Sequence, residues 1–441
     1  MRKLQTIRLR RVRWPFNFQL NRNIWLVLLT TAVFGFTIEG GIYSVLFNIY
    51  LLRLDYGTAF IGGINSIDMF VFTLVSIPAG ILGQRWGARR TMLLGISFTA
   101  FSGLLIPTAQ LFPAVGEAAM LMTAIGLRGA GIALFLVTST PYIMAFTSDK
   151  SRNTAFTLDS AAYGLAAFCG GLLGGVLPNW IASWLGTTLE DANAYRYPFV
   201  VVGVLLLLGV WLIWKTDNEP MDTETKTSSM VTTWRVMPTT LRSVILFFIA
   251  ISILGGVGMG VPWTFSTVYL DDFHHVPTSL IGTFAAIASL VGVGSVLILP
   301  RLTKRWSLLG VTVVAYLISG ITIVLIGAVA DWRLAGLSFI AVMGLNNLRF
   351  TAYRIYTIEP IPKAYQSFAS GLFNSGVGLG YGLMALVSGF LIAQIGYTLL
   401  FLLSGAIMLL AGLMIGWYGV PSLSRSAIGS QAAVAIPDGV E

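Results

Sequence analysis

The chain has 441 residues, of which 56% are apolar and only 10% are charged, and its mean hydropathy is +0.81. A soluble domain carries about 25% charged residues, so this composition excludes a soluble enzyme, a disordered chain, a nucleic-acid-binding protein and a disulfide scaffold. The formal charge of +9 suggests an acidic partner, but the placement of the charges indicates membrane topology instead.

In chain order, twelve apolar runs are each long enough to cross a bilayer. Backbone groups inside hydrocarbon must bond to one another, and no run alternates apolar and polar residues as a membrane barrel would, so we predict helices. The first six runs are Ile24–Leu51, Thr58–Gly83, Thr91–Leu111, Glu117–Phe146, Thr154–Ile181 and Tyr197–Lys215. The last six are Leu241–Leu270, Ser279–Leu299, Leu308–Ala330, Leu334–Glu359, Ser367–Ala393 and Thr398–Tyr418.

A single long polar stretch, Thr216–Thr240, divides these runs into six and six. We therefore predict an N-terminal six-helix half (1–215), a cytoplasmic linker (216–240), a C-terminal six-helix half (241–420) and a disordered cytoplasmic tail (421–441).

Lysine and arginine lie mainly on one side of the predicted membrane. The segments on the side of the N-terminus hold 21 of the 27, whereas the opposite loops hold only Arg53, Arg196 and Arg333. The positive-inside rule then places both termini in the cytoplasm of a multi-pass protein of the inner or plasma membrane. We interpret the basic start, 1–14, as a topology signal on anionic headgroups rather than as a transit peptide or a nucleic-acid-binding arm.

The two halves share short repeats. Gln84–Gly87 after the second run recurs as Lys304–Ser307 after the eighth, at a shift of 220 residues, and Ile61–Gly62 recurs as Ile281–Gly282 at the same shift. Six-helix halves related in this way place a substrate site at their interface near the midplane, open to each side in turn.

The loop after the second run carries a recognisable motif, GILGQRWGARR at 80–90. It resembles the G-x-x-x-D-R-x-G-R-R signature of the major facilitator superfamily, and the resemblance covers essentially the whole chain. It implies an all-α membrane protein with twelve transmembrane helices in two pseudo-symmetric six-helix halves. The glycines permit a tight turn, and the arginines can hold headgroups or helix C-termini. The conformational motif would comprise Gly80, Gln84, Arg85, Gly87, Arg89 and Arg90.

Three details bear on the subtype. Gln84 stands where the signature has aspartate, so we expect a neutral hydrogen bond there instead of a charged lock between the halves. Leu127–Gly131 is a partial match to the family's R-x-x-x-G pattern. Gly170–Gly175 is similar to the G-P-x-x-G-G element of proton-coupled antiporters, with Gly171 in place of proline, and close helix packing explains it equally well. The resemblance is therefore to the drug and multidrug antiporter type.

Charged residues inside the predicted spans indicate the coupling chemistry. Glu39, Asp68 and Arg128 lie within about 5 Å of the midpoints of their runs and share one layer. If one acid pairs with Arg128, the other is favoured in its protonated form and can bind and release a proton. We predict proton coupling at these three residues, with Glu39 as the carrier.

Aromatic and polar residues near the same depth suggest a substrate cavity. Four aromatic residues share a helical face with Glu39 in the first run, and the glycine-rich stretch 255–263 of the seventh run reads as an interrupted helix beside a cavity. Two polar residues one turn apart come from the tenth run. The predicted lining is Phe36, Tyr43, Phe47, Tyr50, Trp263, Asn346 and Arg349.

A gate is expected nearer the cytoplasm. Asp159 and Arg354 lie at similar depth in opposite halves. The family resemblance implies that their helices approach one another when the inner side is closed, so we predict a salt bridge between them.

These features favour a secondary transporter rather than an enzyme. The leading prediction is proton-coupled efflux of a small amphiphilic compound by alternating access. The alternative is a symporter or exchanger of a small organic anion or sugar, with Arg128 and Arg349 as anion ligands. A different class, an intramembrane enzyme or a non-transporting receptor, lacks supporting motifs. No cofactor or metal is expected, since the pair His274–His275 reads as a solvated loop. The expected partners are the substrate, protons and lipid, without nucleic acid, and the expected state is a monomer.

Overall fold

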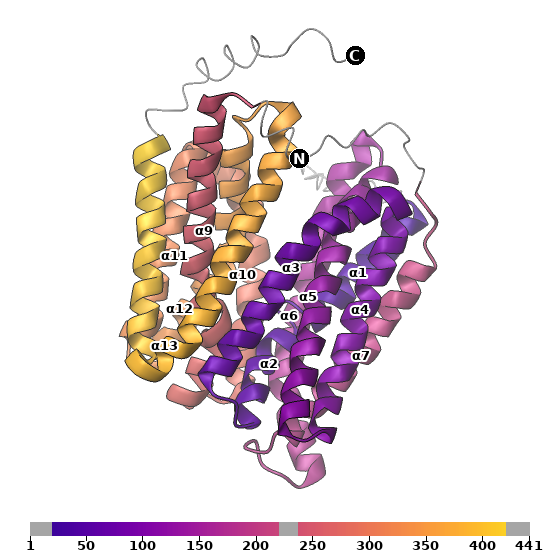
Figure 1. The fold of residues 1–441 in the computed structure, drawn as a ribbon, viewed down its shortest axis with the longest axis vertical. Coiled ribbons are helices and arrows are strands. Elements are labelled where there is room, and N and C mark those ends of the chain that lie inside the picture. Colours follow the sequence, from indigo (N-terminus) through magenta and orange to yellow (C-terminus); the bar gives the residue numbers. More distant parts are fainter. Residues whose placement is uncertain (1–19, 220–236, 420–441) are drawn as a thin grey trace, which may run out of the picture.

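A computed structural model describes residues 20–219 and 237–419 (Figure 1). Every regular element in these two ranges is a helix. The basic start, most of the predicted linker and the predicted tail lie outside the described residues.

The helices of the first half are α1 (Arg22–Thr37), α2 (Ile42–Arg53), α3 (Thr58–Trp86), α4 (Ala88–Thr108) with a short 3-10 turn η1 (Ala109–Leu111), α5 (Ala114–Ala145), α6 (Asp149–Leu185) and α7 (Asn193–Trp214). Those of the second half are α9 (Thr239–Val268) with a π turn η2 (Tyr269–Phe273), α10 (Thr278–Arg305), α11 (Leu308–Ala328), α12 (Trp332–Ile358) and α13 (Lys363–Gly419).

Length and hydropathy alone single out ten candidate membrane spans among the described residues. One of them, Phe368–Tyr418, lies in α13 and divides at Gly396, whose φ of 75° and ψ of 170° interrupt the helix. The tenth predicted span, α12, is not among the ten because residues such as Asn346 and Arg349 lower its hydropathy. When α13 is counted as two spans and α12 is added, the structure has the twelve crossings that the sequence predicts.

The first predicted span is not one helix. It breaks between Thr37 and Ile42, where Gly40 has a φ of 76°, a conformation that favours glycine. The prediction that Phe36, Glu39 and Tyr43 share one helical face is therefore wrong, since Phe36 and Tyr43 belong to different helices.

The most extensive contacts between the halves are those of α3 with α13 and of α6 with α10. Glycines allow the close approach: a Cβ added at Gly62 would clash with the Ala385 carbonyl of α13, and one at Gly175 would lie 2.9 Å from Cα of Gly282 on α10. In the Gly170–Gly175 segment, Gly170 and Gly174 face α1 and α2. The packing explanation of this segment is thus sufficient.

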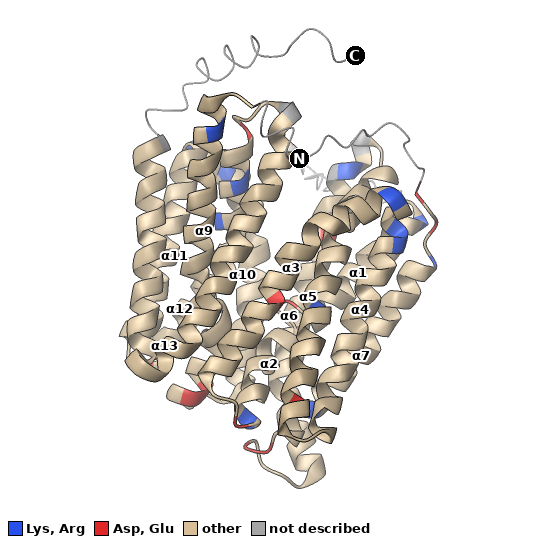
Figure 2. Ribbon diagram, viewed as in Figure 1, with Lys and Arg blue, Asp and Glu red and all other residues tan. Residues whose placement is uncertain are grey.

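We call the end of the molecule next to both termini the terminal end, and the opposite end the far end (Figure 1). At the far end, the side-chain amide of Asn48 donates to the carbonyl of Thr264 at 2.7 Å, and Thr58 Oγ1 donates to the carbonyl of Gly389 at 2.9 Å. Basic residues gather at the terminal end of both halves (Figure 2), as their placement along the sequence indicates.

The halves also pack closely away from the far end. A Cβ added at Gly378 would clash with Thr73 Oγ1, and one at Gly164 would clash with Val293. Closer to the terminal end, α12 and the start of α13 border an open cleft of about 630 Å³. These contacts between the halves thus gather at the far end and toward the middle, and a cleft bordered by α12 and α13 lies at the terminal end.

Candidate functional site

A buried ion pair lies in the middle of the first half. Arg128 of α5 binds Asp68 of α3, and these residues are only 8% and 3% exposed. Gly129 makes the approach possible, because a Cβ there would lie 3.1 Å from Asp68 Oδ1 and closer still to its carbonyl. The ring of Tyr43 lies 4.2 Å from the Arg128 guanidinium carbon. The Arg128 side chain is thus held by Asp68 of α3 and by Tyr43 of α2.

Glu39 lies beside this pair, in the break between α1 and α2. Its Oε2 accepts a hydrogen bond from the Tyr163 hydroxyl at 3.1 Å, and its carbonyl oxygen lies 3.2 Å from the same hydroxyl. Its charge interacts with those of Asp68 and Arg128. No ion pair between described residues includes Glu39, so it is the acid of this layer without a bonded cation.

Two tyrosines complete the layer. Tyr163 comes from α6, and Tyr381 comes from α13 in the other half, where its hydroxyl lies 3.3 Å from Thr264 Oγ1. The Tyr381 hydroxyl is close enough to interact electrostatically with Glu39, Asp68 and Arg128. Sequence reasoning missed both tyrosines, because a tyrosine in an apolar run is most often a packing residue and only the arrangement of helices reveals these two.

Part of the predicted cavity lining packs inside the first half instead. Phe47 stacks on Tyr43 at 4.7 Å, and the rings of Phe47 and Tyr50 lie 6.2 and 5.3 Å from Phe199 of α7. Phe47 and Tyr50 are 3% and 0% exposed. Their assignment to a cavity is therefore corrected to core packing, because α7 covers the face that the sequence left open.

The predicted residues of the second half lie on two helices. Arg349 is 4% exposed, its guanidinium lies 4.9 Å from the Tyr316 ring, and its Nη2 donates to Asn346 Oδ1 at 2.7 Å. Trp263 is 36% exposed and meets the Tyr381 ring edge-on at 6.5 Å.

The expected interruption of the seventh run is wrong. Helix α9 continues through 255–263, and a Cβ at Gly260 would lie 2.7 Å from Cβ of Met384 on α13. The glycines of α9 serve its close packing on α13 rather than a break.

The predicted loop motif turns at Gly87, whose φ is 92°. The carboxylate of Glu219 accepts hydrogen bonds from the backbone N–H groups of Ala88 and Arg89 at the start of α4. Arg89 also donates to Asn218 Oδ1 at 3.0 Å and to the Trp214 carbonyl at 2.6 Å. This loop thus holds a carboxylate, supplied by the start of the linker and confined to the first half. The neutral hydrogen bond of Gln84 between the halves stays a prediction. Gln84, Arg85 and Arg90 are exposed.

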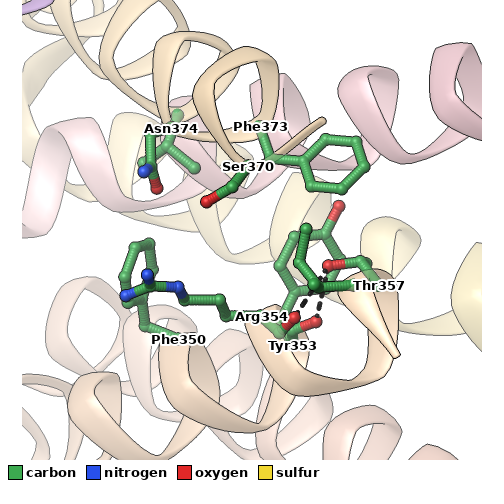
Figure 3. A pocket seen from close by; sticks show the side chains of 9 residues that line it. Phe350, Tyr353, Arg354, Thr357, Ser370, Phe373 and Asn374 are labelled. Carbon is green, nitrogen blue, oxygen red and sulfur yellow. Dashed lines mark hydrogen bonds between the residues drawn. The ribbon is translucent and has the colours of Figure 1, made fainter. Parts of the chain in front are cut away.

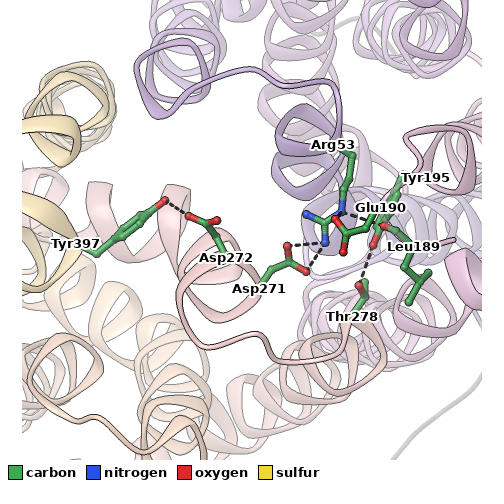
Figure 4. A network of polar contacts seen from close by, with 8 residues as sticks. All are labelled: Arg53, Leu189, Glu190, Tyr195, Asp271, Asp272, Thr278 and Tyr397. Atoms are coloured by element: carbon green, nitrogen blue, oxygen red, sulfur yellow. Dashed lines mark hydrogen bonds and ion pairs between the residues drawn. The ribbon is translucent and has the colours of Figure 1, made fainter.

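A polar cluster closes the far end (Figure 4). Arg53 of α2 forms an ion pair with Asp271 of η2 at 2.8 Å, and its Nε donates to the Leu189 carbonyl at 2.9 Å. The hydroxyls of Tyr195 and Thr278 meet at 3.1 Å across the same interface. Sequence reasoning missed this cluster because its members lie in or beside loops of different lengths, where spacing carries no signal.

The two predicted gate residues have different surroundings. Asp159 hydrogen-bonds to Thr31 of α1, whereas Arg354 is exposed and lines a cleft with Ser370 and Asn374 (Figure 3). No ion pair between described residues joins Asp159 and Arg354. Because the terminal end is open, their bridge in a closed state stays a prediction.

Comparison with known proteins decides the family, since the sequence model of the Major Facilitator Superfamily matches residues 27–374. The chain belongs to the major facilitator superfamily. A relative from Bacillus subtilis (strain 168), the uncharacterized MFS-type transporter YfiU, is 28% identical over 163 residues. That match covers 36% of this chain and about a third (30%) of the relative.

Solved structures of the superfamily share the fold. A D-xylose-proton symporter gives a TM-score of 0.72 at 16% identity over 92% of this chain and 98% of its own. A single-substitution mutant of the nucleoside transporter NupG gives 0.71 at 15% identity over 90% and 99%. The xylose transporter XylE from E. coli, in an inward open conformation, gives 0.71 at 15% identity over 93% and 99%.

Membership of the major facilitator superfamily makes this chain a multi-pass membrane transporter and not an enzyme. The all-helical architecture predicted from the sequence is confirmed. These findings do not identify an antiporter subtype.

Proposed function

We propose that this protein is a proton-coupled secondary transporter that works by alternating access, with Glu39 as the proton carrier. The observation that supports this proposal most strongly is the position of Glu39, bonded to a neutral hydroxyl beside the ion pair of Asp68 and Arg128. An ionised carboxylate without a cation is costly at this depth, so a proton on Glu39 changes the energy of the layer. One of the solved structures with a similar fold is a D-xylose-proton symporter, which accords with proton coupling.

The charge of the layer follows from this arrangement. With Glu39 protonated, the layer of Glu39, Asp68 and Arg128 carries no net charge, and with Glu39 ionised it carries one negative charge. Rearranging the halves around a neutral layer avoids moving an uncompensated charge through a region of low dielectric. Protonation of Glu39 therefore favours the exchange between the two open states.

Two locks would alternate during the cycle. The far-end lock is the Arg53–Asp271 ion pair, which is closed in this structure. We propose that Asp159 and Arg354 form the opposite lock when the terminal end closes. In the cell this terminal end would face the cytoplasm, in keeping with the placement of lysine and arginine along the sequence.

The direction of transport and the substrate follow from different residues. The prediction that an antiporter exports an amphiphilic compound is based on an aromatic face that includes Phe47 and Tyr50. These two residues pack on Phe199 instead of lining a cavity, so they no longer support it. The remaining support for efflux is the exposed Trp263 beside Tyr381. The second candidate, transport of a small organic anion together with a proton, is favoured by the buried Arg349.

The test is flux in proteoliposomes under an imposed pH gradient of either sign. Ethidium, D-xylose and gluconate serve as amphiphilic cation, sugar and organic anion. Accumulation of gluconate on the alkaline side indicates symport, and movement of ethidium against the proton flow indicates antiport. We expect Glu39→Gln to abolish accumulation, whereas Glu117→Gln, a carboxylate at the far end of α5, should retain it. Full accumulation in Glu39→Gln would contradict the proposal.

A further inference from the structure

We propose that Arg349 binds the anionic group of the transported substrate, which makes the substrate class a small organic acid with a carboxylate or similar oxyanion. This inference deepens the proposed function and rests on it. It starts from an asymmetry: the fourth span of each half, α5 and α12, carries a buried arginine, but only that of α5 has a carboxylate partner.

The acids of the second half all lie near helix ends. Asp271 and Asp272 are in the far-end turn, Asp331 caps the start of α12, and Glu359 follows its last residue. Arg349 lies nine residues before the end of α12, which corresponds to about 14 Å along the helix. No ion pair between described residues includes Arg349. Its charge therefore has no counter-charge from its own half.

The contacts that Arg349 does make are with neutral groups. They include the Asn346 amide oxygen at 2.7 Å, the face of the Tyr316 ring at 4.9 Å and a hydrogen bond with the Tyr316 side chain. The buried Nε has no hydrogen-bond partner. A guanidinium has five N–H donors in a fork that matches a carboxylate, and a buried arginine without an anion is costly. A bound oxyanion would supply the counter-charge that this guanidinium lacks.

A glycine of α9 lets Arg349 and Tyr316 pack closely against that helix. A Cβ added at Gly255 of α9 would lie 3.2 Å from Arg349 Nη1 and 3.0 Å from the Tyr316 hydroxyl. Any side chain at position 255 would therefore press on both groups that face it.

The cleft at the terminal end lies on the same helix as this site, one turn beyond it. Tyr353, one turn from Arg349 on α12, lines the narrow part of the cleft with Asn374, and its ring lies 5.8 Å from the Tyr316 ring (Figure 3). The exposed Arg354 borders both the narrow and the wide part. Positive charge at such an entrance raises the local concentration of anions.

The charges of the two halves then balance during transport. With Glu39 protonated and Asp68 paired with Arg128, Arg349 leaves one positive charge, and a monovalent anion neutralises it. The loaded carrier is neutral when it holds one proton and one anion, so the expected stoichiometry is one to one. Release of the proton from Glu39 and of the anion restores the unloaded charges, with no covalent step.

The test measures binding to the purified full chain at constant pH, without a gradient. Two matched sets of probes differ in charge only: gluconate, glucose and glucosamine, and benzoate, benzamide and benzylamine. A ligand of the folded state raises the unfolding temperature by mass action. We expect stabilisation by at least one anion of the two sets and no comparable effect of its neutral or cationic counterpart.

The variants are Arg349→Gln, Arg349→Lys and, as a matched control on the same helix, the exposed Arg333→Gln. Arg349→Gln should weaken anion binding by about 10- to 100-fold, Arg349→Lys should retain part of it, and Arg333→Gln should bind as the wild type does. Arg349→Gln loses the contacts with Asn346 and Tyr316 but no ion pair, so its ligand-free unfolding temperature should stay close to that of the wild type. Arg349→Lys keeps the test open if Arg349→Gln does not fold.

Any of three results would overturn the inference. The first is that no anion stabilises the wild type, and the second is that Arg349→Gln binds the anion as tightly as the wild type does. The third is that both Arg349 variants lose ligand-free stability while the anion response of the folded protein is unchanged. Failure here is separate from failure of proton coupling, because this binding test does not involve Glu39→Gln or a pH gradient.

Discussion

At the scale of single residues, the ion pair of Asp68 and Arg128 is a buried structural element and, in our proposal, part of the coupling layer. Intramembrane charges are rare and costly, so the sequence alone could predict that these two residues matter and that they share a layer. It could not predict Tyr163 and Tyr381, because their role depends on how α6 and α13 pack around the break at Glu39.

The pair makes a prediction about stability. Arg128→Ala should lower the free energy of unfolding by about 3–5 kcal/mol, because Asp68 is left as a buried charge without a partner. Asp68→Asn in the same chain should recover part of this loss. Reversible denaturation in detergent, followed by circular dichroism over the four members of the cycle, measures the coupling; strict additivity of the two changes would show that the pair contributes nothing.

At the scale of helices, hydropathy marks most of the spans directly, whereas the polar α12 and the division of α13 at Gly396 need the whole sequence pattern or the structure. The break in the first span and the unbroken α9 were not predictable, although both segments contain glycines. The difference is tertiary: Gly40 adopts a positive φ, whereas Gly256 and Gly260 stay helical because α13 packs against them. Composition reports the presence of glycine, but only packing determines how it is used.

Adjacent glycines of α3 give a matched pair for testing helix packing. A Cβ at Gly62 would clash with the backbone of α13, whereas one at Gly63 meets nothing within 4 Å. We expect Gly62→Ala to cost about 1–3 kcal/mol and to impair transport. Gly63→Ala should be neutral or gain up to about 1 kcal/mol in helix propensity. Unfolding temperatures of the two variants check this, and equal behaviour would remove close packing from the account.

At the scale of the whole molecule, the far-end lock should determine which side is open. Spin labels at the exposed far-end positions Thr188 and Ala330, in a Cys169→Ser background, report the separation of the halves. Arg53→Ala should shift their distance distribution toward longer values, because it removes the ion pair with Asp271. The exchange Arg53→Asp with Asp271→Arg should restore the original distribution. An unchanged distribution in Arg53→Ala would mean that other contacts hold the far end closed.

The opposite lock has its own test. Asp159→Arg and Arg354→Asp should each reduce transport by preventing closure of the terminal end, and the two together should restore it. Recovery is measured as initial flux in proteoliposomes relative to the wild type. Coupling energy near zero between the two changes would exclude the bridge.

The central claim is that Glu39 carries the proton, and it can be tested without knowing the substrate. A pH jump on solid-supported membranes containing the transporter should move protons onto the Glu39 carboxylate and displace charge. We predict a transient displacement in the wild type and in Glu117→Gln that is absent in Glu39→Gln. The same displacement in wild type and Glu39→Gln would contradict the claim.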